Sequence, residues 1–484
     1  MKNDIIVGLD IGTTKIACFV GQRGEGDKVR ILGFGRTESI GVDKGVVINI
    51  NQTANSIRKA VKAASEQAGV EVTEVYVGIA GQHIKSLKNY GEIVINNEKG
   101  RVTQAEVDML HEQQRNIINL EPGQEIIHVF AQSYAIDKNE LSPDMDVVGV
   151  AGKCLSANFH IVTANKSNLQ NIHDSVTDAG LKVKGVVLEP IASAYAVLNE
   201  RERQGGAALV DIGGGTTDVA IFYEDTVRHT SVLAVAGNAI TNDIRKGCNI
   251  MRDQAELLKV KFGSCLPSAV NDDDNVSIPS IRNQPPREIN MKYLAGIINA
   301  RTKSILELAG YEIQLSKYDN QLIGGIVLTG GGSRLKHIKE LCDLTNAQET
   351  RIGTPDEHID PSTDKNIISE LSHPMYSTGI GLVLYGIYTE DNPYEEDEPE
   401  VEEAPMPEEK SAPEAHSGID IFAGMGDSQQ PAEPAPAPEP EPEPAQEQKP
   451  KKKNKKEKTP KTEGKGWIKS VGNYLNDVFF GNME

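Results

Sequence analysis

Asp10-Ile-Gly-Thr-Thr-Lys15 and Asp211-Ile-Gly-Gly-Gly-Thr-Thr-Asp218 are the two stretches of sequence that decide the fold of this chain. Each follows an apolar run with the length of a strand and precedes another such run. A glycine-rich turn of this kind lets backbone N–H groups approach an anion without interference from side chains. A single copy is more often a plain hairpin, whereas two copies predict two related lobes that face one ligand.

The residue types in these loops suit a nucleotide triphosphate, which we predict to be ATP with Mg²⁺. Glycine N–H groups, threonine hydroxyls and one lysine are expected to contact the phosphates: Gly12, Thr13, Thr14, Lys15, Gly213, Gly214, Gly215, Thr216 and Thr217. Asp10 and Asp211 end their strands and are expected to hold Mg²⁺ through water, because this ion keeps much of its water shell. A third glycine run follows the predicted strand 326–329 and precedes a helix predicted to start near Ser333. It places Gly330, Gly331, Gly332 and Arg334 where a purine and ribose could approach the backbone.

The surrounding pattern alternates strands with helices, which is typical of an α/β body with a central sheet. Strands are predicted over residues 5–10, 16–20, 75–79, 183–187, 207–211 and 219–223. Helices are predicted over residues 54–68, 167–178, 190–198, 253–260 and 291–308. The polar stretch 264–290, with its three consecutive aspartates, is interpreted as a loop.

The charge of the chain is concentrated near its C-terminus. The net charge is −20, but residues 391–448 hold 18 acidic residues and one lysine, and residues 449–484 hold ten lysines and four acidic residues. These segments sum to −17 and +6, so residues 1–390 carry −9, an ordinary value. Residues 391–466 are rich in Pro, Glu, Ala and Lys and are predicted to be a disordered linker, acidic and then basic. The short apolar stretch 419–425 inside it is interpreted as part of the linker, and a docking motif is the disfavoured alternative.

Residues 467–481 predict an amphipathic helix that binds an anionic membrane. Its apolar residues share one helical face: Trp467, Ile468, Val471, Tyr474, Leu475, Val478 and Phe479. Nine lysines precede it, and basic residues near anionic headgroups strengthen such binding. Docking on a protein, or a disordered end, is the alternative interpretation.

The body itself is expected to be cytoplasmic. The N-terminus lacks the apolar stretch of a signal peptide, and no window reaches the length of a membrane-spanning helix. The five cysteines form no Cys-x-x-Cys pair, which fits a reducing compartment.

These motifs together resemble the actin-like ATPase superfamily. Glu189-Pro-Ile-Ala-Ser-Ala-Tyr195 and Met375-Tyr-Ser-Thr-Gly-Ile-Gly-Leu382 resemble its two connecting segments. Ala255-Glu-Leu-Leu-Lys-Val-Lys-Phe-Gly263 is similar to a helix whose Glu and Lys reach the ribose and base. The resemblance therefore implies Glu256 and Lys259 as nucleoside contacts, although a solvated helix face would show the same residues.

Within this superfamily the chain resembles the FtsA family of bacterial cell-division proteins. The resemblance covers residues 4–390 and rests also on Gly100-Arg-Val-Thr-Gln-Ala-Glu-Val107 and His128-Val-Phe-Ala-Gln-Ser-Tyr-Ala-Ile-Asp137. It implies an actin-like two-lobed fold of duplicated ribonuclease-H-like domains with an inserted subdomain. The expected subdomains are 1A (1–82 and 163–200), the inserted 1C (83–162), 2A (201–240 and 321–390) and 2B (241–320).

The resemblance implies a scaffold for cell division. The expected partners are the C-terminal peptide of the tubulin-like FtsZ at 2B, further copies of the chain in a filament, later division proteins, and the cytoplasmic face of the inner membrane at the septum; nucleic acid is not expected. The alternative is a small-molecule kinase or phosphatase of the same fold. A chaperone ATPase would need a folded domain after residue 390, and the inserted segment disfavours an MreB-like filament protein.

Hydrolysis of ATP is left open by the sequence. It requires an oriented water and stabilisation of charge, and Asp211 and Glu189 are the candidate catalytic carboxylates. The same two residues could serve only magnesium hydration or structure. We therefore expect slow hydrolysis at most, with ATP acting mainly as a clamp on the two lobes.

Overall fold

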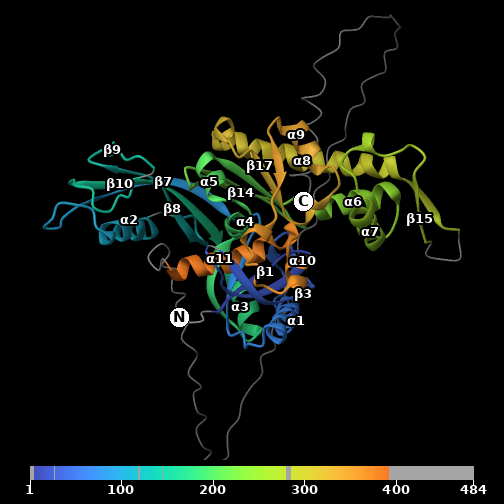
Figure 1. Cartoon of the computed structure of the whole chain (residues 1–484), viewed down its shortest axis with the longest axis horizontal. Helices are drawn as coiled ribbons and strands as arrows, with labels where there is room; N and C mark the ends of the chain where they lie inside the picture. Colours follow the sequence, from blue (N-terminus) through green and yellow to red (C-terminus); the bar gives the residue numbers. More distant parts are fainter. Residues whose placement is uncertain (1–4, 27, 118–119, 144, 280–284, 392–484) are drawn as a thin grey trace, which may run out of the picture. The chain divides into compact units, whose positions relative to one another are not determined.

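Two five-stranded sheets with the same topology form the centre of the fold (Figure 1). The computed structural model describes residues 5–26, 28–117, 120–143, 145–279 and 285–391. The predicted linker from residue 392 onward and the predicted helix 467–481 lie outside these residues. The first sheet has the order β3-β2-β1-β6-β11, formed by β1 (Ile5–Ile11), β2 (Lys15–Arg23), β3 (Val29–Glu38), β6 (Glu74–Ile79) and β11 (Lys182–Leu188).

The second sheet repeats this arrangement strand for strand. Its order is β14-β13-β12-β17-β18, formed by β12 (Ala207–Ile212), β13 (Thr217–Tyr223), β14 (Thr226–Leu233), β17 (Ile326–Thr329) and β18 (Thr350–Ile352). In both sheets the first three strands of this order pair antiparallel with one another. The third strand, β1 or β12, then pairs parallel with the fourth, and the fourth pairs parallel with the fifth. The predicted duplication of one α/β unit is thereby confirmed.

Two helices, α4 (Glu189–Val197) and α11 (Ser377–Asp391), lie side by side between the two sheets (Figure 1). They correspond to the two predicted connecting segments. One hydrophobic core joins them to strands of both lobes, with Phe19 from the first sheet and Leu209 from the second. A Cβ atom at Gly381 would lie 1.7 Å from the carbonyl oxygen of Ala192, so only glycine permits this close packing.

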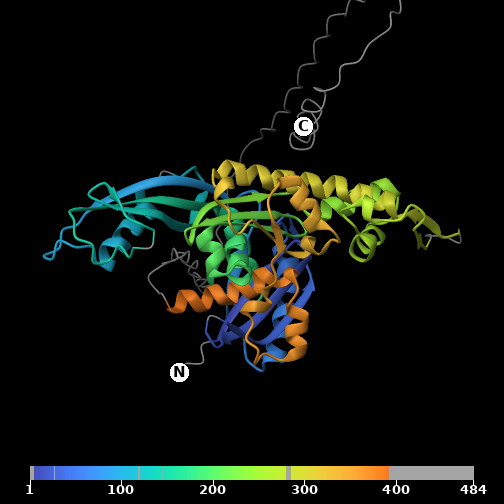
Figure 2. The same cartoon turned by 45° about the horizontal axis from the view of Figure 1, so that its top comes forward.

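The outer face of each sheet is covered by further helices and has its own core. In the first lobe these are α1 (Ile50–Ala68) and α3 (Lys166–Asp178). Helix α1 begins where the Asn49 side chain accepts from the N–H of Gln52 and ends at Gly69, whose φ is 69°. In the second lobe they are the long α8 (Met291–Ser316), which packs along β13 and β14, and α9 (Ile338–Asn346) (Figure 2).

An inserted domain separates β6 from α3 in the first lobe. Its sheet has the order β7-β10-β8-β9, formed by β7 (Lys85–Val94), β8 (Gln124–Ile136), β9 (Asn139–Glu140) and β10 (Cys154–Asn165), with α2 (Gln104–Ile117) packed on it. Leu110, Leu155 and Phe159 belong to a core that is separate from those of the lobes. The insertion is therefore a small folded domain.

The second lobe has its own extension between β14 and β17. It contains α6 (Gly237–Cys248), α7 (Arg252–Phe262), β15 (Asn275–Ile278), β16 (Arg287–Asn290) and α8. The prediction that 264–290 is only a loop was wrong, because β15 and β16 pair antiparallel within it. Ile278 and Ile289 are 6 % and 5 % exposed and join the core of the second lobe, which holds this pair of strands against the body.

The predicted helix start near Ser333 was also wrong. Residues Gly331–Arg334 form a single 3₁₀ turn, and α9 begins only at Ile338. The left-handed conformation of His337 (φ 62°) separates the turn from the helix. The remaining short strands and α-helices of the described residues are β4 (Val42–Asp43), β5 (Val46–Val47), α5 (Glu200–Gly205) and α10 (Lys365–Leu371). None of the helices in the described ranges is long and apolar enough to cross a membrane.

Candidate functional site

The two predicted phosphate loops touch each other directly. A Cβ atom at Gly214 would lie 2.3 Å from Cγ2 of Thr14, and one at Gly215 would lie 2.5 Å from Oγ1 of Thr13. The β1–β2 turn of the first lobe and the β12–β13 turn of the second therefore meet face to face. Glycine is required on one side of this contact because threonine occupies the other.

Strand register shows which residues of the two loops are equivalent. Asp10 pairs with Ala17 across β1 and β2, and Asp211 pairs with Asp218 across β12 and β13. Counting forward from Asp10 and Asp211, Thr13 and Thr14 correspond to Gly214 and Gly215, while Lys15 corresponds to Thr216 and Ala17 to Asp218. The two Thr-Thr pairs, which look like a shared motif in the sequence, thus occupy different places in the two lobes.

The first loop carries the positive charge of the site. The ammonium of Lys15 donates to Oδ2 of Asp10, whose side chain is 6 % exposed. Burial alone would lower the pKa of Lys15, but the charge and hydrogen bond of Asp10, and then the charges of Glu189 and Asp211, raise it above its ordinary value. Lys15 therefore stays charged.

The second loop carries two buried carboxylates. Oδ2 of Asp211 accepts from the Ser193 hydroxyl at 2.7 Å and from the Thr378 hydroxyl at 3.3 Å. Oδ2 of Asp218 accepts from the Thr216 hydroxyl at 3.2 Å, whereas Oδ1 of Asp218 has no hydrogen-bond partner among the described residues. Burial raises the pKa of both carboxyl groups. The charge of Asp10 raises the pKa of Asp211 further, and the charge of Asp211 raises the pKa of Asp218 further.

Glu189, at the start of α4, completes the acidic side of the site. Burial raises the pKa of its carboxyl well above the ordinary value, and the charges of Asp10, Asp218 and Asp211 raise it further, against the opposing effect of Lys15. The site thus holds four carboxylates and one lysine. The excess of negative charge fits a bound divalent cation, although no group of three or more His, Cys, Asp or Glu within the described ranges is arranged to ligate a metal directly. A cation held through water and phosphate is consistent with both observations.

Part of the predicted phosphate-binding set is already engaged within the protein. The N–H of Gly213 donates to the carbonyl of Thr216 at 2.9 Å and closes the turn. The hydroxyl of Thr217 donates to the carbonyl of Val235 at 2.8 Å. Oγ1 of Thr13 accepts from the N–H of Gly45 at 3.0 Å. Thr14 is exposed, and Gly12 and Lys15 are partly exposed beside it.

Glu256 and Lys259, predicted as nucleoside contacts, lie beside the second loop. The ammonium of Lys259 is 2.8 Å from Glu256 and donates to the carbonyl of Gly237 at 3.1 Å. The N–H of Gly237 in turn donates to the carbonyl of Gly213 at 3.1 Å. The first turn of α6 therefore links these two side chains of α7 to the loop.

The third glycine run also reaches the second loop. A Cβ atom at Gly330 would lie 2.2 Å from Oδ1 of Asp211, and one at Gly332 would lie 2.4 Å from Cγ2 of Ile212. Gly331 and Arg334 are exposed, and the Arg334 guanidinium contacts the Met375 sulfur at 3.5 Å. All three predicted loops are thus brought together around Asp211.

Three residues of the site were not identified from the sequence. The sequence motif predicted no role for Asp218, although a polar residue in place of Ala17 at a buried strand position could have indicated one. Ser193 and Thr378 lie in the two connecting helices, and their hydroxyls are 3.0 Å apart. Serine and threonine inside apolar helical segments were the signal for these two.

Comparison with known proteins decides the family. The chain is 36 % identical over 388 residues to the cell division protein FtsA of Pseudomonas aeruginosa, and this match covers 80 % of this chain and 90 % of that protein. The chain belongs to the FtsA family. The family model for cell division protein FtsA matches residues 208–381, and the model of the SHS2 domain inserted in FtsA matches residues 81–163. The FtsA of Neisseria meningitidis is 35 % identical over 385 residues, and this match covers 79 % of this chain and 90 % of that protein.

The fold is also found in a solved structure of more distant sequence. A chain of the PilM-PilN type IV pilus biogenesis complex covers 80 % of this chain and 99 % of its own length, with 15 % identity and a TM-score of 0.55. At this identity the likeness shows the fold alone. The actin-like fold with its FtsA-type insertion is therefore confirmed, and FtsA relatives disfavour the small-molecule kinase or phosphatase. The predicted subdomain boundaries stay predictions.

Proposed function

We propose that this member of the FtsA family binds one ATP with Mg²⁺ between its two phosphate loops and uses it to set the contact between the lobes. The contact between Thr13–Thr14 and Gly214–Gly215, beside three buried carboxylates and the half-buried Glu189, is the observation that supports this. Asp10 and Asp211 would hold the hydrated cation, which would supply charge neutralisation to the phosphates. Lys15 would contribute a second positive charge.

The nucleoside would lie on the side of Glu256, Lys259 and the third glycine run. Gly331 leaves the backbone exposed there, and Arg334 is exposed beside it. Lys259 donates to the carbonyl of Gly237, whose N–H donates to the carbonyl of Gly213 in the second loop. A contact between Lys259 and the ribose would therefore also affect that loop.

Hydrolysis is proposed to be slow. Glu189 and Asp211 are the carboxylates available to orient a water. Oδ2 of Asp211 already accepts from the hydroxyls of Ser193 and Thr378, so this oxygen is not free to orient a water. ATP would then serve chiefly as a clamp that sets competence for filament formation.

At the level of the cell we propose a division scaffold on the cytoplasmic face of the inner membrane. The region 241–320 would bind the C-terminal peptide of FtsZ, further copies would form a filament, and later division proteins would be recruited. The predicted helix 467–481 would attach the chain to anionic lipid through Trp467, Ile468, Val471, Tyr474, Leu475, Val478 and Phe479. A single short helix binds weakly, so filament formation would supply avidity.

Co-sedimentation of FtsZ with anionic liposomes tests this proposal. The intact chain should carry FtsZ into the pellet, and a chain ending at Gly466 should not. Val471→Glu places a charge on the predicted apolar face and should also release the protein, whereas the matched Asn473→Glu on the polar face should not. Equal recruitment by the intact and shortened chains would refute the tether.

A further inference from the structure

The inserted domain leaves the first lobe but is hydrogen-bonded to the second. We call this contact the seam and define it by Gln132 and His160 of the inserted domain and Arg228 and Thr230 of β14. The Gln132 side-chain amide donates to the carbonyls of Val227 and Arg228 at 2.9 and 3.0 Å, and the Arg228 guanidinium donates to the carbonyl of Gln132 at 2.6 Å. Nε2 of His160 lies 2.9 Å from Oγ1 of Thr230.

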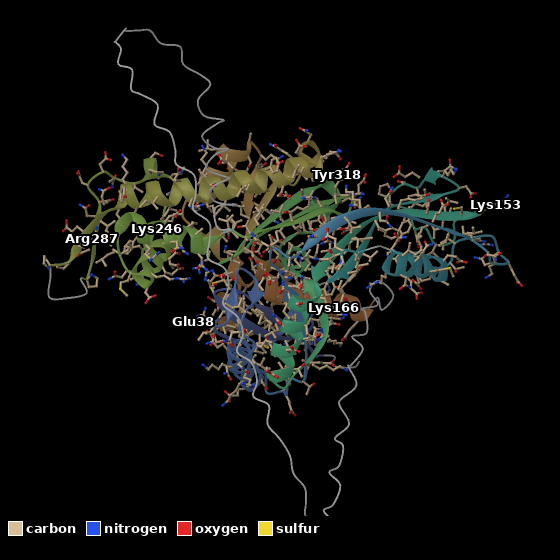
Figure 3. All side chains as sticks on the ribbon, turned by 180° about the vertical axis from the view of Figure 1, so that it is seen from behind. Glu38, Lys153, Lys166, Lys246, Arg287 and Tyr318 are labelled. Atoms are coloured by element: carbon tan, nitrogen blue, oxygen red, sulfur yellow. The ribbon has the colours of Figure 1, made fainter. Side chains whose placement is uncertain are left out.

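Three of the four seam residues are buried, and Arg228 has further partners in its own lobe. Arg228, Thr230 and His160 are 6 %, 5 % and 1 % exposed. The Arg228 guanidinium also donates to the Tyr223 carbonyl at 3.1 Å and to Glu224 at 2.7 Å. It lies 5.7 Å from the ring centre of Tyr318, which Figure 3 labels just beyond α8. A buried polar contact with fixed partners resists sliding, because each separated group would be left without a hydrogen bond.

The segment that carries the seam leads directly into the second phosphate loop. Strand β14 ends at Leu233, and two residues later the carbonyl of Val235 accepts from the Thr217 hydroxyl at 2.8 Å. The N–H groups of Gly237 and Asn238 then donate to the carbonyls of Gly213 and Gly214 at 3.1 and 2.8 Å. One short stretch of chain thus bonds to the inserted domain at one end and to the loop at the other.

We propose that the seam couples the second phosphate loop to the inserted domain, so that a nucleotide bound between the lobes changes the position of that domain relative to the second lobe. The proposal rests on the proposed nucleotide binding. Strand β14 belongs to the second lobe, whereas the inserted domain is covalently part of the first. Any movement of one lobe against the other must therefore displace or strain the hydrogen bonds of the seam. Coupling is reciprocal, so a ligand of the inserted domain would change nucleotide affinity by the same factor.

Hydrogen exchange of the full chain with and without Mg-ATP tests the coupling. In the unchanged protein, ATP should slow exchange both in the loop at 213–218 and in the parts of β8 and β10 beside the seam. Thr230→Val removes the hydroxyl that meets His160 while keeping the shape of the side chain. It should keep the ATP effect on the loop and reduce the effect on the inserted domain about fivefold, the equivalent of one hydrogen bond.

Thr226→Val is the matched control, because Thr226 lies on the same strand but bonds to the carbonyl of Glu224 outside the seam. It should leave both effects unchanged. Should Thr230→Val fail to fold, as thermal unfolding would reveal, Gln132→Leu replaces it with the same expectation. An ATP effect confined to the loop in the unchanged protein, or an undiminished effect in the seam variant, would overturn the coupling. Absence of any effect on the loop would overturn the proposed nucleotide site, and the coupling with it.

Discussion

The two lobes have the same strands in the same order, yet their phosphate loops carry different chemistry. Even the irregularity in the second strand recurs at the equivalent step, between Val20 and Gly21 in the first lobe and between Ile221 and Phe222 in the second. The first loop contributes an ammonium group and two threonines. The second contributes two buried carboxylates and the glycines that leave room for those threonines. Duplication has kept the backbone and divided the tasks, so each half of the site depends on the other.

The largest effect is expected from the positive charge of the first loop. Lys15→Met would leave Asp10 buried without its partner among three further carboxylates. We expect a loss of about 3 kcal/mol in the free energy of unfolding, together with loss of ATP binding, measured by chemical denaturation and by titration. Lys62→Met is the control, since that exposed lysine pairs with Glu66 at 3.8 Å and should cost about 0.5 kcal/mol or less. Similar losses in the free energy of unfolding in the two variants would show that Lys15 does not stabilise the buried carboxylates.

The next effect comes from the steric fit between the loops. Gly214→Thr would force a side chain against Thr14 and should weaken ATP binding by about 2 kcal/mol, roughly thirtyfold. The atoms that a Cβ at Gly214 would meet all belong to the Thr14 side chain, so adding Thr14→Gly should restore much of the affinity.

Gly215 provides the contrast to this exchange. A Cβ there would also lie 2.8 Å from Cα of Lys44, which is backbone. The double change Gly215→Thr with Thr13→Gly should therefore stay impaired. Equal rescue at both positions would show that the loops do not meet as described.

The smallest effect concerns the carboxylate that only the second lobe carries. Burial and Asp211 raise the pKa of Asp218, so the folded state binds more protons than the unfolded state between the ordinary carboxyl pKa of about 4 and the raised value. Stability of the unchanged protein therefore falls as the pH rises through this window. Asp218→Asn removes that loss and should add about 1 kcal/mol at pH 7.5, with the gain shrinking as the pH approaches about 4.

Thermal or chemical unfolding at both pH values measures this gain. The exposed Asp273→Asn is the control and should change stability by no more than about 0.5 kcal/mol at either pH. A gain from Asp218→Asn that did not depend on pH would contradict the explanation by charge burial.

Much of this fold could be predicted from local patterns in the sequence. Apolar runs before Asp10 and Asp211 predicted the central strands, and the glycine runs predicted the three loops that meet at Asp211. The apparent repeat of Thr-Thr misled, because equivalence depends on strand register and not on matching letters. Ser193 and Thr378 could not be placed at Asp211 from the sequence, since their contact joins helices far apart along the chain. The strands within 264–290 were missed because only a few apolar residues fix them to the second lobe.

The most direct test of the account is a calorimetric titration of the full chain with Mg-ATP, repeated with a variant of each loop. We predict one ATP per chain for the unchanged protein, loss of that site in Lys15→Met of the first lobe, and roughly thirtyfold weaker binding at the same site in Gly214→Thr of the second, with recovery when Thr14→Gly accompanies the latter. Undiminished binding of one ATP in either single variant, provided that the variant is folded, would contradict the claim that two unlike loops build one site.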